Sequence, residues 1–140
     1  MRIEQRNHRG ITLIELLVVM VIIAMFATLV GARLFQRVDR ARQLQAKSQI
    51  QEFENVLDIW RPDVGRYPST EEGLQALMVK PANIENWDGP YLKKDIPVDP
   101  WNHAYVYRQP GQHGDYDLTA LGDDGQEGGA GNASDIVNWK

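Results

Sequence analysis

An apolar stretch at residues 11–32 constrains this 140-residue chain more than any other feature. From Leu16 to Ala32 the stretch carries no charged side chain. As an α-helix with a rise of about 1.5 Å per residue, it is long enough to cross a hydrocarbon core of about 30 Å. The stretch is therefore predicted to be a membrane helix. Roughly a hundred residues follow it, which is enough for a small folded domain.

Three kinds of segment share this pattern: a cleavable secretory signal, an uncleaved signal anchor, and a membrane helix that is cut on its N-terminal side. A secretory signal has an apolar region of about 7 to 15 residues followed by a small-residue cleavage site. The stretch here is longer, it contains Glu15, and Val30-Gly31-Ala32 is a weak cleavage site. A secretory signal is therefore disfavoured.

Glu15 separates the other two kinds of segment. A carboxylate near the centre of a bilayer costs about 2.5 to 3.5 kcal/mol on insertion scales, so it needs a partner or a function. In an uncleaved anchor, Glu15 would lie near the interface or be protonated. If the chain is cut between Gly10 and Ile11, the new α-amino group, with an ordinary pKa of about 7.7 to 8.0, becomes a cation near Glu15. A helix brings the two groups within one turn, and neighbouring chains can pair them across subunits.

The charge balance and the absence of cysteine exclude several classes of function. Residues 1–10, which precede the possible cut, contain three basic residues and one acid: Arg2, Arg6, Arg9 and Glu4. Residues 11–140 therefore carry 12 basic and 18 acidic side chains, a net charge of −6. This balance predicts no nucleic-acid surface. The chain has no cysteine, which excludes disulfides, cysteine zinc sites and thiol catalysis. Charge alone does not orient the membrane helix, because basic residues also follow it: Arg33, Arg37, Arg40, Arg42 and Lys47.

Apolar residues recur at helical spacing between Gln36 and Trp60, which predicts that the membrane helix continues beyond the bilayer. The two parts together predict one helix of about fifty residues that ends at Arg61-Pro62. The end of this stripe is expected to form the core seam of the soluble domain, whereas Arg33 to Lys47 is expected to pack in an assembly. The residues of the stripe are Ala46, Ile50, Phe53, Leu57 and Trp60.

The rest of the chain predicts an α+β domain. The segment "YPSTEEGLQALMVKP" favours a short helix with Ser69 as N-cap and Glu72 in capping-box spacing. Residues 82–103 favour an irregular connection, while residues 104–108 and 116–121 favour an antiparallel hairpin. We expect a small sheet that packs on the soluble half of the long helix. The expected packing anchors in the connection are Trp87, Tyr91 and Trp101.

The segment "LGDDGQEGGAGNASD", residues 121–135, combines glycines with acidic side chains. Such a loop loses much conformational entropy when it becomes ordered. Calcium is a suitable partner because it binds six to eight carboxylate and carbonyl oxygens. The EF-hand pattern fails, however, and a calcium β-helix repeat is missing too. From the residues alone, a disordered acidic loop and a calcium site both remain open.

No pattern in the chain predicts catalysis. His8, His103 and His113 are scattered, and no pair of them has the spacing of a helical metal site. The serines and the paired acids lie in caps and loops rather than in a nucleophile elbow or a carboxylate dyad. We expect that the protein is not an enzyme.

The stretch "RGITLIELLVVMVII" resembles the class III signal of type IV pilins and type II secretion pseudopilins. These signals have a short basic leader, a glycine at the cut, and an apolar helix with glutamate at the fifth mature position. The resemblance implies that prepilin peptidase cleaves after Gly10, that Ile11 becomes the N-methylated N-terminus, and that Glu15 serves in assembly. The family usually has Phe at the position of Ile11.

Three more stretches resemble the major, G-type pseudopilins of type II secretion: "RYPSTEEGLQALMVKP", "YLKKDIPVDPWNHAYVYRQPGQHGDYDL" and "LGDDGQEGGAGNASDIVNW". The chain departs from this family at residues 102–104, where Asn-His-Ala replaces a Gly-Asn-Pro-like turn, and near Gly131, where many relatives have an acid. The resemblance implies one structural calcium ion in the loop in place of the absent disulfides. Its implied ligands are the side chains of Asp124 and Asp135 and the carbonyls of Leu121 and Gln126.

The resemblance implies a pilin-like α+β fold in which a long N-terminal helix packs against a small antiparallel sheet with a C-terminal calcium loop. It implies a cleaved leader at 1–10, a membrane and filament-core helix at 11–35 and a periplasmic domain at 36–140. Such a single-pass inner-membrane protein would form a homo-oligomeric helical filament that drives folded proteins through the outer membrane, with minor pseudopilins and an inner-membrane assembly platform as partners. Two alternatives are a subunit of another type IV pilus-like system and a monomeric, membrane-anchored periplasmic calcium-binding module, which needs neither cleavage nor Glu15.

Overall fold

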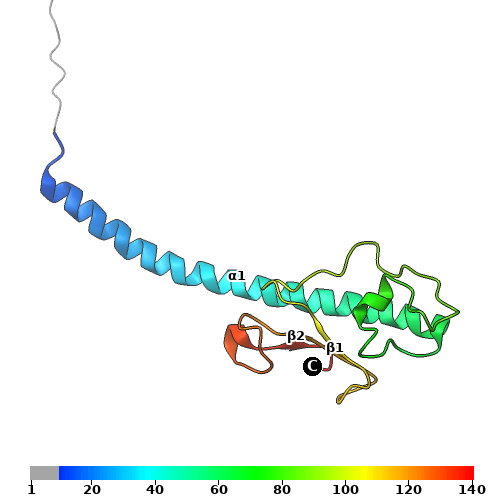
Figure 1. Cartoon of the computed structure of the whole chain (residues 1–140). Helices are drawn as coiled ribbons and strands as arrows, with labels where there is room; N and C mark the ends of the chain where they lie inside the picture. The colour runs from blue at the N-terminus through cyan, green and yellow to red at the C-terminus, as the bar shows by residue number, and fades with distance from the viewer. Residues whose placement is uncertain (1–9) are drawn as a thin grey trace, which may run out of the picture. The chain divides into compact units, whose positions relative to one another are not determined.

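The computed structural model describes residues 10–140, apart from the side chains of residues 32 and 33. The rest of the predicted leader and His8 lie outside the described residues. The chain forms two compact units, Met1–Val38 and Asp39–Lys140, and each is described by itself. The elements, drawn in Figure 1, are helix α1 (Leu13–Val64), 3-10 helix η1 (Leu74–Leu77), strands β1 (Val106–Arg108) and β2 (Asp117–Ala120), 3-10 helix η2 (Gly131–Ala133) and strand β3 (Ile136–Val137).

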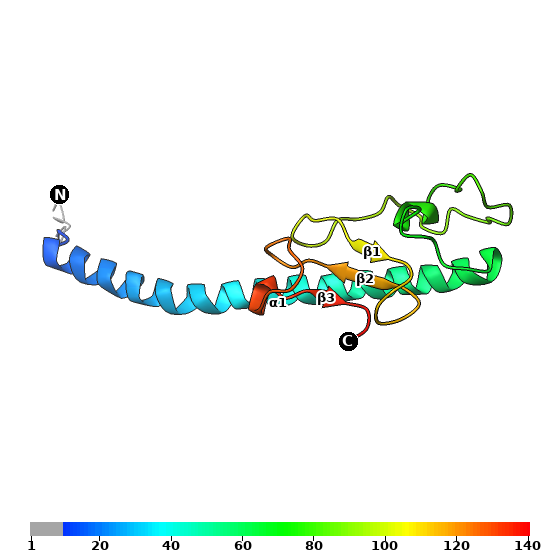
Figure 2. The same cartoon turned by 60° about the horizontal axis from the view of Figure 1, so that its bottom comes forward.

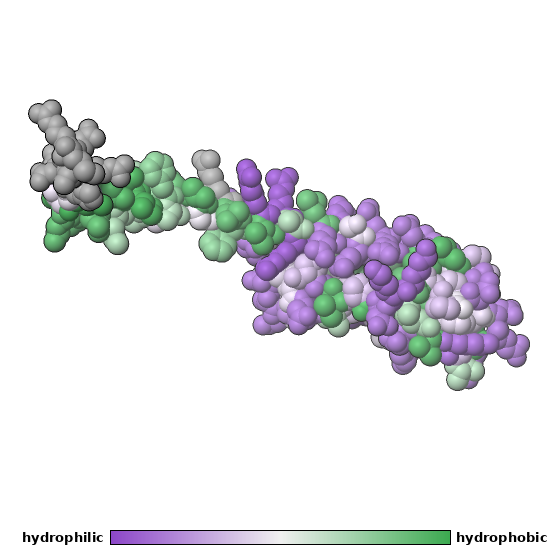
Figure 3. Space-filling view, turned by 90° about the horizontal axis from the view of Figure 1, so that it is seen from above, coloured by the Kyte–Doolittle hydropathy of each residue, from purple (hydrophilic) through white to green (hydrophobic). Residues whose placement is uncertain are grey.

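In the first unit, α1 presents its apolar side chains to the outside. Leu13 is 85% exposed and Phe26 is 62% exposed, and Figure 3 shows this part of the chain as a nearly continuous apolar surface. Among the described residues, α1 is the one helix that is long and apolar enough to cross a membrane. An apolar surface of this kind needs a lipid or protein environment.

The predicted long helix is confirmed, since α1 has 52 residues, but the prediction that it ends at Arg61-Pro62 is wrong. Pro62 lies inside the last turn, where the loss of one backbone N–H interrupts few hydrogen bonds. The helix ends instead at Gly65, which has a φ of 86° and donates its N–H to the Arg61 carbonyl at 2.7 Å. A glycine in this left-handed conformation is a common end for a helix.

The core of the second unit forms along one face of α1. Leu74 and Leu77 from η1 and Leu118 from β2 belong to the same buried cluster. The periodicity therefore identified the core face correctly, and the connection residues Trp87, Tyr91 and Trp101 pack against this cluster as expected. The residues of the predicted stripe each expose 2% or less of their surface: Ala46, Ile50, Phe53, Leu57 and Trp60.

The sheet has the strand order β1-β2-β3, and both pairs of strands are antiparallel. Figure 2 shows it alongside the part of α1 that belongs to the second unit. The predicted hairpin is confirmed, with Tyr107 opposite Leu118, although both strands are shorter than predicted. Strand β3 was not predicted, because two residues carry too little pattern.

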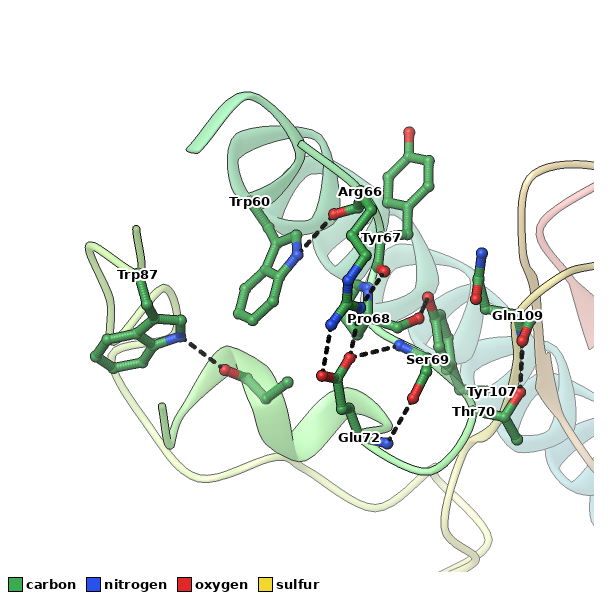
Figure 4. A network of polar contacts seen from close by, with 11 residues as sticks. Trp60, Arg66, Tyr67, Pro68, Ser69, Thr70, Glu72, Trp87, Tyr107 and Gln109 are labelled. Carbon is green, nitrogen blue, oxygen red and sulfur yellow. Dashed lines mark hydrogen bonds and ion pairs between the residues drawn. The ribbon is translucent and has the colours of Figure 1, made fainter. Parts of the chain in front are cut away.

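The segment after α1 has the predicted cap, and the predicted short helix is the 3-10 helix η1. The Ser69 N–H donates to Glu72 at 2.7 Å, and the Glu72 N–H donates back to the Ser69 hydroxyl at 3.3 Å, which is a capping box. Gly73, with a φ of 58°, then separates this turn from η1, so only a 3-10 helix forms. Figure 4 shows the polar network around this turn, in which the Trp60 indole donates to the Arg66 carbonyl at 2.9 Å.

Candidate functional site

The start of α1 holds the residues predicted for cleavage and assembly. Gly10 and Ile11 lie before the first helical turn, and Ile11 is 75% exposed. Glu15 lies in the first turn of the helix. The Thr12 hydroxyl accepts the Glu15 N–H at 3.3 Å, so Thr12 is the N-cap of α1. The sequence analysis missed this cap, although Thr-x-x-Glu is the spacing that predicts a capping box.

The glycine-rich loop, residues 121–135, is folded through positions that favour glycine. The Asp124 carboxylate accepts the Gln126 N–H at 3.1 Å, and the Asp135 carboxylate accepts the Gly128 N–H at 2.8 Å. The Asp135 Oδ1 atom is buried and has no hydrogen-bond partner. A buried carboxylate oxygen without a partner is costly, so it points to a cation or water in this loop. The loop glycines with positive φ are Gly122, Gly125, Gly128, Gly129 and Gly131.

The oxygen donors of this loop fit calcium, which prefers carboxylate and carbonyl ligands. The structure brings Asp124 and Gln126 together in one turn, and the bond from Gly128 to Asp135 ties the end of the loop to its middle. Within residues 10–140, no three or more His, Cys, Asp or Glu side chains are grouped to hold a metal ion. Glu127 pairs with Arg108. A metal would therefore need backbone carbonyls to complete its coordination.

Contacts from distant parts of the second unit hold the loop. The Asn132 amide donates to the Asp39 carboxylate at 2.6 Å, and the Gln43 amide donates to the Gly131 carbonyl at 3.3 Å. His103 Nδ1 lies 3.1 Å from the Gly122 carbonyl oxygen. Asp39 and Gln43 are one turn apart on α1 and therefore share a face. Sequence reasoning missed these contacts because no local pattern links residues so far apart.

The two described histidines have structural surroundings. His113 stacks on Trp139 with ring centroids 4.0 Å apart, and its Nδ1 lies 3.0 Å from the Asp117 carboxylate. Burial acts to raise the pKa of Asp117, but N–H bonds from Gln112 and His113 outweigh it and hold that pKa below its ordinary value. The Asp117 carboxylate thus holds the backbone of residues 112–113 and the His113 ring in place.

Comparison with known proteins gives two family matches. The family "Type II secretion system (T2SS), protein G" matches residues 33–139, and the "Prokaryotic N-terminal methylation motif" matches residues 5–31. The chain belongs to the major pseudopilins of type II secretion systems. This G-type family is structural and has no catalytic activity, which agrees with the sequence analysis.

Individual relatives cover nearly the whole chain. The type II secretion system core protein G of Pseudomonas aeruginosa is 45% identical over 97% of this chain and 98% of its own length. The corresponding protein of Vibrio cholerae is 42% identical over 97% of this chain and 94% of its own length. The crystal structure of the major pseudopilin of enterohaemorrhagic Escherichia coli matches 72% of this chain and 89% of its own, with 38% identity and a TM-score of 0.62. The predicted G-type resemblance and the pilin-like arrangement of helix and sheet are confirmed.

Proposed function

We propose that this pseudopilin is stored as a single-pass precursor in the inner membrane, with residues 36–140 in the periplasm. Prepilin peptidase then removes residues 1–10, and Ile11 becomes the N-methylated N-terminus of a membrane and filament-core helix at 11–35. The methylation-motif match across this region supports the proposal. The exposed position of Gly10 and Ile11, ahead of the helical hydrogen bonds, supports it as well, because a peptidase needs an extended backbone.

The single observation that carries the assembly mechanism is the position of Glu15. It is an exposed acid in the first turn of α1, and the large apolar side chains next to it, such as Leu13 and Leu16, are exposed as well. A carboxylate in such surroundings needs a partner, and cleavage creates a cation at Ile11, about one turn away. In the filament, Glu15 of one copy neutralises the Ile11 amine of a neighbour and so fixes the register between subunits.

The Thr12 cap offers a second role for Glu15, and the two roles make different predictions. Glutamate and glutamine both serve at the third helical position of a capping box. If Glu15 only stabilised the helix start, the Glu15→Gln variant would assemble normally. Under the pairing mechanism Glu15→Gln fails, because the amide cannot neutralise an amine.

The test compares Glu15→Gln, Glu15→Leu and a control, Thr28→Leu, produced with the other secretion components. Thr28 is a polar residue in the same apolar stretch, residues 11–32, and its hydroxyl donates to the Met25 carbonyl at 2.8 Å. All three variants should enter the alkali-resistant membrane fraction. Filaments sheared from the cells should be absent for both Glu15 variants and present for Thr28→Leu. Normal filaments from Glu15→Gln would leave only the capping role.

We also propose that the glycine-rich loop binds one calcium ion through the side chains of Asp124 and Asp135 and the carbonyls of Leu121 and Gln126. The partnerless Asp135 Oδ1 atom supports this proposal. A bound ion supplies positive charge that neutralises the loop acids and fixes their backbone. In the full chain in detergent, a chelator should lower the melting temperature, and Asp135→Asn should remove that effect. Identical melting with calcium and with chelator would contradict the proposal.

The assembled filament would act in the periplasm and drive folded proteins through the outer membrane. Its partners would be further copies of this chain, minor pseudopilins and an inner-membrane assembly platform. Membership of the secretion-system family supports partners of this kind.

A further inference from the structure

His103 lies between a fixed turn and the glycine-rich loop. Its backbone N–H donates to the Asp99 Oδ1 atom at 2.7 Å, and the Asp99 N–H donates to the His103 carbonyl at 2.8 Å. The Trp101 N–H donates to the same Asp99 oxygen at 3.0 Å. The Asp99 side chain is buried, so this turn is anchored in the body of the second unit. The backbone of His103 is therefore held in place by contacts that do not involve the loop.

The imidazole ring of His103 contacts the loop in two places. Its Nδ1 lies 3.1 Å from the Gly122 carbonyl oxygen. A carbonyl oxygen only accepts hydrogen bonds, so Nδ1 must carry the proton of the contact. The ring also covers the backbone of Gly125, where a Cβ atom would lie 3.0 Å from Nε2 and 3.1 Å from Cε1. Gly122 and Gly125 flank Asp124, so the ring braces the turn that contains three of the proposed calcium ligands.

We propose that His103 is a positioning residue that holds the 121–126 turn in its ligand-binding conformation and thereby raises the calcium affinity of the loop. The inference rests on the proposed calcium site. A turn with Gly122 and Gly125 has large conformational freedom when it is released, and that freedom opposes binding. Loss of one hydrogen bond and of the ring contact should weaken calcium binding about tenfold.

The test measures the calcium dissociation constant of the full chain in detergent micelles by isothermal titration, with calcium alone as the ligand. His103→Leu removes the donor, whereas His103→Asn keeps an N–H donor close to the Nδ1 position. The control Asn102→Gly changes the neighbouring residue of the same turn, whose φ of 72° suits glycine. Tryptophan fluorescence melting in chelator measures the stability of each variant without metal.

The dissociation constant should rise about tenfold for His103→Leu and stay within about threefold of the parent chain for His103→Asn and Asn102→Gly. A purely structural role would instead lower the melting temperature in chelator and leave the dissociation constant unchanged, which would overturn the inference. Absence of calcium binding by the parent chain would overturn the calcium site itself. A further measurement uses only the parent chain and does not depend on how the variants fold. Its ¹⁵N spectra should place the imidazole proton of His103 on Nδ1. A proton on Nε2 alone would overturn the contact.

Discussion

Replacing Glu72 by alanine tests how the turn after α1 is stabilised. The Glu72 carboxylate accepts hydrogen bonds from the two terminal guanidinium nitrogens of Arg66, at 2.6 and 2.7 Å. It also accepts one from the Ser69 N–H at 2.7 Å. Figure 4 shows that these contacts converge on one side chain. The turn leads into η1, whose leucines are part of the core. The substitution therefore removes a cap and an ion pair at once.

The structure sets the size of the expected loss. A capping side chain contributes about 1 kcal/mol. The Arg66 side chain is 46% exposed, so solvent screening reduces the ion pair to about 0.5 to 1 kcal/mol. Together these give about 1.5 to 2 kcal/mol, and a unit of roughly a hundred residues loses about 4 to 8 °C of melting temperature per kcal/mol. We expect Glu72→Ala to melt about 10 °C below the parent chain at pH 7.

Tryptophan fluorescence of the full chain in detergent measures this loss directly, because Trp60, Trp87, Trp101 and Trp139 all lie in the second unit. The bond from Arg66 holds the pKa of Glu72 below its ordinary value. The stability that Glu72 adds is therefore present above an unfolded pKa of about 4.3 and is lost as the pH falls through the lower folded value.

The gap between Glu72→Ala and the parent chain should accordingly shrink below about pH 4. The control Glu52→Ala changes an exposed carboxylate on α1 and should melt with the parent chain. A Glu72→Ala melting temperature within about 2 °C of the parent, or a gap that is the same at pH 7 and pH 3, would refute this reasoning.

Three further predictions concern single side chains. Trp60→Phe should lower the free energy of unfolding by about 2 to 4 kcal/mol in urea denaturation, because it leaves a cavity and an unpaired Arg66 carbonyl. Asp117→Asn should melt below the parent chain at neutral pH, and the difference should narrow as the pH falls below the unfolded pKa of about 3.9, because the folded Asp117 pKa is also held low. Gly129→Ala should make the glycine-rich loop sensitive to limited proteolysis, because Gly129 has a φ of 83° and its Cβ would overlap the Ala133 carbonyl. Protection of the loop equal to that of the parent chain would contradict the last prediction.

The elements that sequence analysis predicted correctly are those with local patterns. The stripe from Ala46 to Trp60 follows the helical period over several turns, and the Ser69 and Glu72 cap is a four-residue pattern. The hairpin is marked by β-forming residues on both sides of a turn-rich segment. Each of these signals can be read within about fifteen residues, so no knowledge of the tertiary fold is needed.

The features that the sequence analysis missed depend on residues far apart in the chain. Strand β3 is recognisable only by its pairing with β2, and the contact between Asn132 and Asp39 joins residues that share no local pattern. The end of α1 was misplaced because Pro62 is a strong local signal for a break, whereas Gly65 is the residue whose φ allows the chain to turn. The brace from His103 to Gly122 likewise needs the folded turn at Asp99.

The intact mass of the mature chain, purified from filaments of its native host, tests the central claim most directly. That claim is that cleavage exposes a cation at Ile11 for Glu15 to neutralise. We expect a chain that begins at Ile11, with the mass of one added methyl group on that residue. A filament subunit that retains residues 1–10, or one that begins near residue 32, would contradict it.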